Sequence, residues 1–218
     1  MWTKLLDLLF PPRCAGCDGN GGWFCAHCQS QCQPIAAAEN AQQHAQLGLA
    51  SLDSSAGVFR FGGPLRPAIH ALKYKRRHAL ARPLGEFTAQ CYAAHRPPAQ
   101  AIVAVPLFAD RLRERGFNQA ALLGGVVARQ WNMPLLDGSL QRTRPTDHQA
   151  NLGRDARQRN VQDAFVWHGP PPPARVVIFD DVLTTGATLA ACAAALKAAG
   201  AQEVYGLALA AAGRGASR

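Results

Sequence analysis

The stretch that decides the fold of this protein is Val176-Val177-Ile178-Phe179-Asp180-Asp181-Val182-Leu183-Thr184-Thr185-Gly186-Ala187-Thr188. Its first four residues form an apolar run typical of a buried strand, and two carboxylates follow where that strand ends. A loop of small residues comes next. The Ala-rich segment from Ala187 to Ala199, followed by Gly200, then predicts a helix with a glycine at its end. The stretch therefore predicts a strand, loop and helix belonging to a parallel sheet.

The loop that follows the two carboxylates has the composition of an anion site. Backbone N–H groups from Thr184 to Thr188, with a helix N-terminus behind them, favour a phosphate. The hydroxyls of Thr185 and Thr188 add donors, and Gly186 lets the backbone approach a ligand closely. Because carboxylates repel a phosphate, we expect them to bind sugar hydroxyls instead. The pattern favours a sugar-phosphate site; the alternative is a strand end with solvated acids and a helix cap.

Strands and helices alternate on either side of this stretch. We expect further strands at 58–61, 101–105, 161–166 and 204–210, and helices at 64–74, 79–94 and 118–131. This alternation predicts an α/β fold with a mostly parallel sheet and helices on both faces. We assign residues 56–218 to this domain. Residues 35–55 are polar and lack strong periodicity, so we interpret them as a linker or loop.

Length, hydropathy and charge limit the class of protein. The chain has 218 residues, of which 48% are hydrophobic and 17% charged, so it can bury a core and is not a disordered chain. No apolar run reaches about 18 residues, and we expect no transmembrane helix. The net charge of +9, carried by 19 Arg and 4 Lys against 14 acids, favours partners such as nucleic acid or polyphosphates. Codon bias in a GC-rich genome is an alternative source of the arginines.

Residues 1–34 hold five of the seven cysteines. Four of them form two Cys-x2-Cys pairs: Cys14, Cys17, Cys25 and Cys28. Four thiolates at this spacing can close a tetrahedral structural zinc site, and a module this small needs the metal to fold. A redox dithiol is the alternative, and His27 and Cys32 rank behind the four as ligands. We see no secretory signal at the N-terminus and expect a cytoplasmic location, where clustered thiols more often hold a metal than form disulfides.

Basic residues gather around one predicted helix. They are Arg66, His70, Lys73, Lys75, Arg76, Arg77, His78 and Arg82, with Tyr74 among them. Such a cluster beside an aromatic ring could follow a phosphate backbone and stack a base, so residues 73–77 (Lys73, Tyr74, Lys75, Arg76 and Arg77) are candidate contacts to DNA. The alternative is the solvated face of a helix.

Taken together, these motifs resemble the ComF family of competence proteins (ComFC/GntX-like), which join an N-terminal zinc ribbon to a type I phosphoribosyltransferase domain. The resemblance extends over nearly the whole chain. Its further motifs are LLDLLFPPRC at 5–14, LKY at 72–74, VPL at 105–107, RLRERGFNQ at 111–119, Arg142-x-Arg144-x-Thr146-x2-Gln149-x2-Leu152, and Arg157-x2-Asn160-Val161.

The resemblance implies that the chain binds phosphoribosyl pyrophosphate (PRPP). Asp180 and Asp181 would bind the ribose hydroxyls, and the 5′-phosphate would be held by Thr184, Thr185, Gly186, Ala187 and Thr188. The loop from Pro106 onward corresponds to the pyrophosphate loop of the family, with Arg113, Arg115 and Lys73 as candidate contacts. Residues 143–160 correspond to the loop that closes over the leaving group. Mg²⁺ would be held mainly by oxygens of the ligand.

Two functions stay open under this resemblance. In the first, a PRPP-binding protein acts in natural competence and DNA uptake, contacts single-stranded DNA, and has other competence proteins as candidate partners. In the second, the chain is an active Mg²⁺-dependent phosphoribosyltransferase with an unknown acceptor. Thr184 stands where some purine-salvage relatives carry a carboxylate base, so neither the acceptor nor the transfer itself is assigned.

Overall fold

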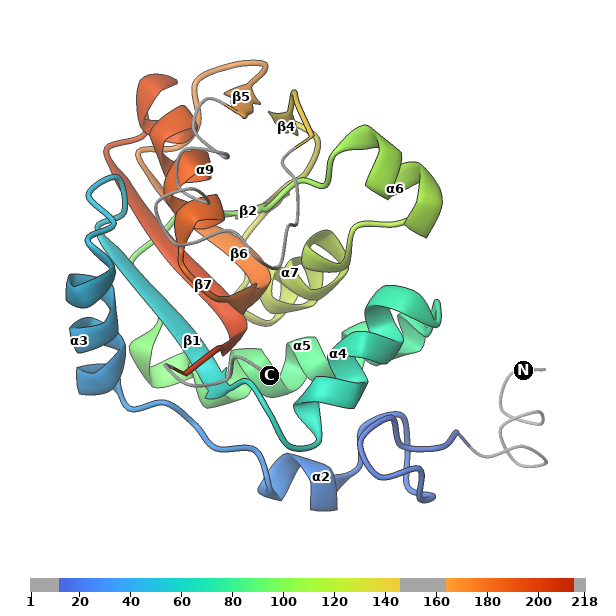
Figure 1. The fold of residues 1–218 in the computed structure, drawn as a ribbon. Coiled ribbons are helices and arrows are strands. Elements are labelled where there is room, and N and C mark those ends of the chain that lie inside the picture. Colours follow the sequence, from blue (N-terminus) through green and yellow to red (C-terminus); the bar gives the residue numbers. More distant parts are fainter. Residues whose placement is uncertain (1–11, 146–163, 214–218) are drawn as a thin grey trace.

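The computed structural model describes residues 12–145 and 164–213 (Figure 1). Its strands are β1 (Ser54–Arg60), β2 (Ala101–Ala104), β3 (Leu135–Leu136), β4 (Leu140–Arg142), β5 (Phe165–Trp167), β6 (Arg175–Leu183) and β7 (Glu203–Ala211). The α-helices are α2 (Ala26–Ser30), α3 (Ala37–Leu47), α4 (Leu65–Tyr74), α5 (Ala81–Cys91), α6 (Ala109–Arg115), α7 (Gln119–Gln130) and α9 (Ala187–Ala198). Short 3-10 turns at His78–Leu80 and Ala93–His95 flank α5.

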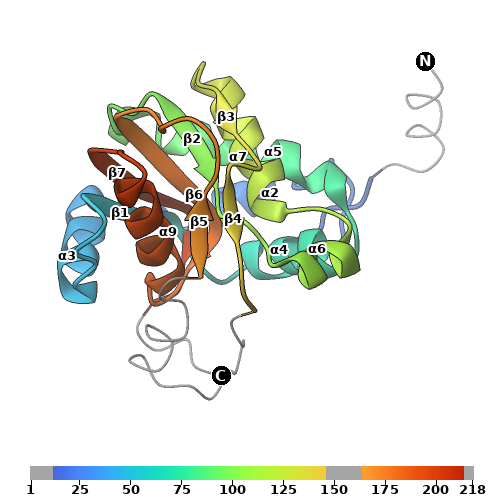
Figure 2. The ribbon, with the colours of Figure 1, turned by 90° about the horizontal axis from the view of Figure 1, so that it is seen from above.

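Five strands form one parallel sheet in the order β1-β7-β6-β2-β3, with β6 in the middle. Alternate residues of β6 face opposite layers, as the pleat of a strand requires. Val177 and Phe179 lie in the core under α4, α5 and α7, whereas Val176 and Ile178 lie in the core under α9. Figure 2 shows α9 on one side of the sheet and α5 and α7 on the other. The predicted fold class, a parallel sheet with helices on both faces, is confirmed.

The cysteine-rich module packs against the sheet domain and shares its core. Phe24 of the module lies 6.2 Å from the ring of Phe87 in α5, and Phe87 stacks on Phe59 of β1 at 4.4 Å. At Gly16 the two parts approach closely, because a Cβ there would lie 2.9 Å from Cβ of Pro64, the residue that precedes α4. The apolar side chains that so small a module cannot bury by itself are therefore buried against the domain.

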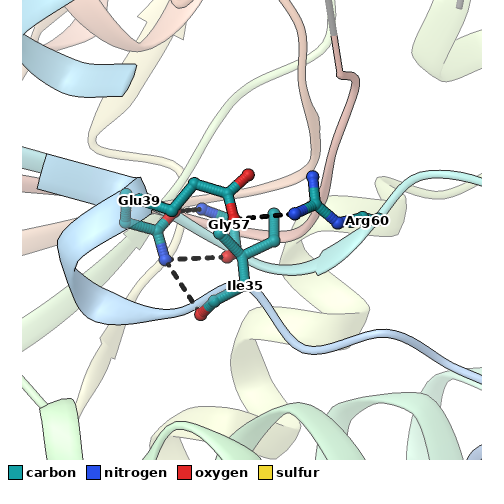
Figure 3. A network of polar contacts seen from close by, with 5 residues as sticks. Ile35, Glu39, Gly57 and Arg60 are labelled. Atoms are coloured by element: carbon teal, nitrogen blue, oxygen red, sulfur yellow. Dashed lines mark hydrogen bonds and ion pairs between the residues drawn. The ribbon is translucent and has the colours of Figure 1, made fainter. Parts of the chain in front are cut away.

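The expectation of a linker or loop at residues 35–55 is wrong for much of that segment. Residues 37–47 form α3, and β1 already begins at Ser54. The helix lies along the outer edge of β1, where the buried Asn40 side chain accepts from the Gly57 N–H at 3.0 Å and donates to the Gly57 carbonyl at 3.2 Å (Figure 3). Arg60 and Glu39 form an ion pair beside it at 2.7 Å. A polar helix with one buried residue carries too weak a periodicity to be read from sequence.

The other predicted elements lie close to their expected places. The strand β6 is longer than predicted and contains both carboxylates, α6 was not predicted, and the expected strand at 161–166 appears as β5, which begins at Phe165. Most of the loop expected at 143–160 lies outside the described residues. In the described ranges, every helix is too short or too polar to cross a bilayer.

Candidate functional site

The sheet topology marks the carboxyl ends of β2 and β6 as a candidate ligand site. The chain leaves β2 through α7 to reach β3, and it leaves β6 through α9 to reach β7 on the opposite side of the sheet. Since neighbouring strands connect in opposite directions here, their carboxyl ends are the usual ligand position in such sheets. Asp180 and Asp181 lie at the end of β6, and the segment from Val105 to Phe108 follows β2.

Asp181 is buried and has two side-chain partners from different helices. Lys73 of α4 forms an ion pair with Oδ2, and Gln119 of α7 donates from Nε2 to Oδ1 at 3.3 Å. Gln119 in turn accepts a hydrogen bond from Arg115, whose guanidinium lies 5.3 Å from the centre of the Tyr74 ring. This network links Asp181 near the carboxyl end of β6 to the end of α4 and, through α7, to α6.

The local backbone explains how Gln119 reaches this position. Gly116 ends α6 with φ of +79°, and Asn118 caps α7 by accepting from the Ala120 N–H at 3.0 Å. The Asn118 amide also donates to the Val105 carbonyl at 2.9 Å, which fixes the start of α7 to the end of β2. The GFNQ sequence therefore turns the chain, caps a helix and places an amide beside Asp181.

Charges in this cluster are coupled. Burial raises the pKa of the Asp180 carboxyl well above its usual range, the neighbouring Asp181 charge raises it further, and Lys73 acts in the opposite direction. Burial alone would lower the pKa of Lys73, but the Asp181 and Asp180 charges outweigh it and raise that pKa. Arg142 of β4 also lies within electrostatic reach of Asp180, and its pKa is lowered, mainly by burial. The site holds two acids and at least two cations in a partly dry environment.

The loop from Thr184 to Thr188 follows directly and begins α9. Gly186 is the N-cap with φ of +74°, and a Cβ at this position would lie 2.5 Å from Leu49 Cδ1. Thr185 Oγ1 accepts from the Ala187 N–H at 3.4 Å, while Thr184 is exposed. The first N–H groups of a helix have no partner within the helix, so this loop has the donors that an anion requires.

The structure divides the predicted basic residues among three places. Lys73 belongs to the Asp181 site. Lys73 also lines a small cavity of about 100 Å³, together with Tyr74, Arg76, Arg111, Glu114 and Arg115. Lys75 and Arg77 line a separate, larger groove between α4 and the cysteine module. Of the two arginines expected near a pyrophosphate, Arg115 lies in the Asp181 network, whereas Arg113 pairs with Asp110 on the exposed side of α6.

The four predicted metal ligands lie together. The Sγ atoms of Cys14, Cys17, Cys25 and Cys28 all lie within 4.8 Å of one another, and the Cys14–Cys28 and Cys17–Cys25 pairs are 3.5 Å and 3.8 Å apart. Four Zn–S bonds of about 2.3 Å in a tetrahedron place sulfurs about 3.8 Å apart, so the geometry fits. The other two candidates have different partners: Cys32 donates to the Cys28 carbonyl and His27 pairs with Gln31. The cluster can hold a metal ion.

Backbone N–H groups prepare one of these thiols for a metal. Burial disfavours the Cys14 thiolate, but the N–H groups of Cys25, Cys17 and Gly16 outweigh it and lower the pKa of Cys14 to about 6. The pKa of the Cys28 thiol is raised by burial and by the neighbouring cysteines. A bound divalent metal would stabilise the thiolate forms of the cluster, including that of Cys28.

Sequence reasoning missed Gln119 and Arg142 as members of the carboxylate site. Both lie in stretches quoted for the family resemblance, RLRERGFNQ and the Arg142-x-Arg144 motif, but their side-chain roles were not assigned. A glutamine that follows an Asn at a predicted helix start is the one local signal, since the capping residue fixes where the next side chain points. Arg142 comes from a two-stranded unit whose position only the fold reveals.

The fold and the site together define a class of protein: an α/β domain with two adjacent acids and a Thr/Gly loop at the end of a parallel sheet, joined to a four-cysteine module. The DNA utilization protein YhgH of Escherichia coli K12 is 36% identical over 152 residues, which cover 67% of each chain. Competence protein F of Haemophilus influenzae is 32% identical over 165 residues, 70% of this chain and 68% of that protein. The chain belongs to the ComF family, which includes these two proteins.

Solved structures similar to this chain are adenine phosphoribosyltransferases. The enzyme of Leishmania tarentolae matches with a TM-score of 0.38 and 19% identity over 63% of this chain and 59% of the enzyme. The Trypanosoma brucei enzyme, in complex with AMP, pyrophosphate and ribose-5-phosphate, matches with a TM-score of 0.37 and 19% identity over 62% of this chain and 55% of the enzyme. No protein-family model matches the sequence.

Proposed function

We propose that this chain is a PRPP-binding protein that handles single-stranded DNA in the cytoplasm during natural competence and DNA uptake, with a structural zinc ion in its cysteine module. The observation that supports PRPP as the ligand is that Asp180 and Asp181 lie near the carboxyl end of β6, with two residues between them and the 184–188 loop, and beside the end of β2. The names of the relatives, DNA utilization protein and Competence protein F, support the DNA part.

The proposed role of each residue follows from the hydrogen bonds that it can still form. Asp180 is partly exposed, so its carboxylate can accept hydrogen bonds from ribose hydroxyls, while Asp181 is already held by Lys73 and Gln119. The loop N–H groups would bind the 5′-phosphate, and Lys73 and Arg115 would lie near the pyrophosphate. In the described ranges, the cysteine cluster is the one group of three or more His, Cys, Asp or Glu residues that could hold a metal. Mg²⁺ would therefore arrive with PRPP and be bound mainly by its oxygens.

Calorimetry with PRPP and Mg²⁺ tests the ligand. We expect Asp180→Asn to weaken PRPP binding by roughly tenfold to hundredfold, because hydrogen bonds to a charged group are worth about 1.5–3 kcal/mol. The matched control is Asp137→Asn, an exposed aspartate after β3. PRPP affinity that is equal in the wild type and Asp180→Asn would sink the sugar-phosphate assignment.

Anisotropy measurements with a fluorescent single-stranded oligonucleotide test the DNA part. The wild-type protein should bind with an affinity that falls as salt rises, because basic side chains displace counterions from the phosphates. Measuring the same affinity with and without PRPP and Mg²⁺ shows whether the two sites are coupled. A protein that binds PRPP but no oligonucleotide would remove DNA handling from the proposal and leave the ligand site.

Pentosyl transfer is a second candidate function, favoured by the cations beside the carboxylates. A leaving pyrophosphate develops negative charge, which Lys73, Arg115 and Mg²⁺ would stabilise. Release of pyrophosphate from PRPP in an acceptor screen over nucleobases and related amines would establish the activity. Binding without turnover for any acceptor would leave the chain as a ligand-binding protein.

A further inference from the structure

A groove of about 650 Å³ separates the first knuckle of the cysteine module from α4. The module supplies residues 14–18, and the opposite wall consists of Arg66, Pro67, His70, Ala71, Lys75 and Arg77. The α4 residues come from one side of the helix, since Arg66 and His70 are four apart and Pro67, Ala71 and Lys75 repeat at the same interval. Lys73 is not among the lining residues and pairs with Asp181, so the groove and the carboxylate site are distinct.

The α4 wall of this groove is positively charged. In the described parts of the chain, Arg66, Lys75 and Arg77 form no ion pair. Arg66 and Lys75 are exposed. The acidic lining residue is Asp18, which lies 3.5 Å from Arg13. Three unpaired cations along one wall attract an anion to that wall, and their spread along the groove suits a chain of phosphates better than a single one.

One aromatic ring lines the groove and a second lies next to it. His70 is a lining residue, and its ring is 4.8 Å from the ring of Tyr74, which lines the neighbouring small cavity and is 60% exposed. Exposed rings beside cations are the features that bind unpaired bases, because every base has a face that can stack. A duplex would keep its bases away from these rings.

We propose that this groove binds single-stranded DNA, with the cysteine module as one wall and α4 as the other. This inference rests on the DNA part of the proposed function. It locates the DNA contact in the groove, whose lining includes Arg66 and His70. The phosphates contact Arg66, Lys75 and Arg77, and bases reach His70 and Tyr74. The cysteine module thus takes part in binding the strand, and its docking on Pro64 sets the width of the groove.

Oligonucleotide binding by two double variants tests the groove. Arg66→Ala with Arg77→Ala removes two charges from it, and Arg129→Ala with Arg175→Ala removes two exposed charges elsewhere. We expect the first to weaken binding of oligothymidylate by about tenfold or more and to make the salt slope shallower by about 1.4, or 0.7 per phosphate contact. The second should leave both close to wild type. Equal effects of the two double variants would show that the groove is not the DNA-binding site, while the protein would still count as a DNA-binding protein.

A gain of affinity provides an independent test. Asp18→Asn removes the carboxylate from the groove and keeps a residue that tolerates the positive φ of 59° found there. It should tighten oligothymidylate binding severalfold, whereas Asp137→Asn, which changes the net charge equally, should not. Identical affinities for the two variants would contradict the placement.

Strand length separates a DNA groove from a pocket for a small anion. Affinity should rise between oligonucleotides of about 4 and about 20 nucleotides, which bracket the usual site sizes, and inorganic phosphate should compete poorly. Affinity independent of length, with full competition by phosphate, would overturn the inference. A wild-type protein that binds no oligonucleotide would overturn both this inference and the DNA part of the proposed function.

Discussion

Adjacent carboxylates at a strand end have different roles because their surroundings differ. Asp181 points into the protein and is held by Lys73 and Gln119. Asp180 is partly exposed, accepts the Asp181 N–H at 2.8 Å, and has a raised pKa from burial and from the Asp181 charge. In the unliganded protein, the ionised form of Asp180 is therefore unfavourable. An acid whose ionised form destabilises the fold is more often a functional residue than a stabilising one.

This leads to a prediction about stability and pH. A carboxyl whose pKa is raised on folding stabilises the fold below its unfolded pKa of 3.8, and that stability is lost as the pH rises through the folded pKa. Asp180→Asn removes the charge and keeps an acceptor for the Asp181 N–H. We expect a higher unfolding midpoint than wild type at neutral pH, by about 2–4 °C per kcal/mol recovered, and a smaller difference near pH 4.

Thermal unfolding followed by circular dichroism at the two pH values measures this effect. Asp137→Asn, at an exposed position, serves as the control and should behave like wild type at both. If Asp180→Asn is less stable than wild type at neutral pH, the prediction is wrong and the fold stabilises the Asp180 charge.

At the scale of elements, the edge of the sheet is protected by the segment before it. β1 is an edge strand, and unpaired edges invite pairing with other chains. Residues 33–35 donate to or accept from Val58 and Arg60, and Asn40 of α3 satisfies both backbone groups of Gly57. A side-chain amide, with one donor side and one acceptor side, substitutes here for the backbone of a sixth strand.

Replacing this amide should destabilise the fold. Asn40→Ala leaves the buried N–H and carbonyl of Gly57 without a partner, and an unsatisfied buried group costs about 1–3 kcal/mol. Urea unfolding should report a loss of this size, with the exposed α3 residue Gln42 changed to Ala as a control near zero. A loss no larger than that of Gln42→Ala would mean that water replaces the amide at the edge.

At the scale of the whole molecule, the cysteine module and the sheet domain share one apolar core. Cys14, Phe24 and Cys28 belong to the same apolar cluster as residues of β1, α4 and α5. The module also forms one wall of the groove beside α4. A change in the metal site should therefore reach the domain.

Metal removal tests this coupling. Native protein should contain about one zinc per chain, and chelation should lower the unfolding midpoint of the entire protein in a single transition, because metal binding contributes folding free energy. Cys17→Ser should reproduce the effect, whereas serine at Cys91, an exposed cysteine outside the cluster, should not. Two separate transitions, with the sheet domain melting at an unchanged temperature, would show that the module folds independently.

The sequence by itself determined the features that depend on neighbouring residues: the central strand, the type of sheet and the cysteine cluster. The apolar run ending in Asp180 and Asp181 predicted the central strand and its loop, the strand and helix alternation predicted the parallel sheet, and two Cys-x2-Cys pairs predicted the cluster. Each of these depends on residues close in the chain, whose chemistry is read directly. The ligand roles of these residues stay predictions.

Only the tertiary structure decided which distant residues meet. Lys73 and Asp181 are far apart in sequence, and no local pattern shows that α4 places Lys73 at the carboxylates but Lys75 and Arg77 in a separate groove. The helix α3 escaped prediction because its single buried residue, Asn40, is polar and packs on a strand edge. Such contacts follow from the register and packing of whole elements, which the collective burial of apolar surface determines and a short stretch of sequence does not.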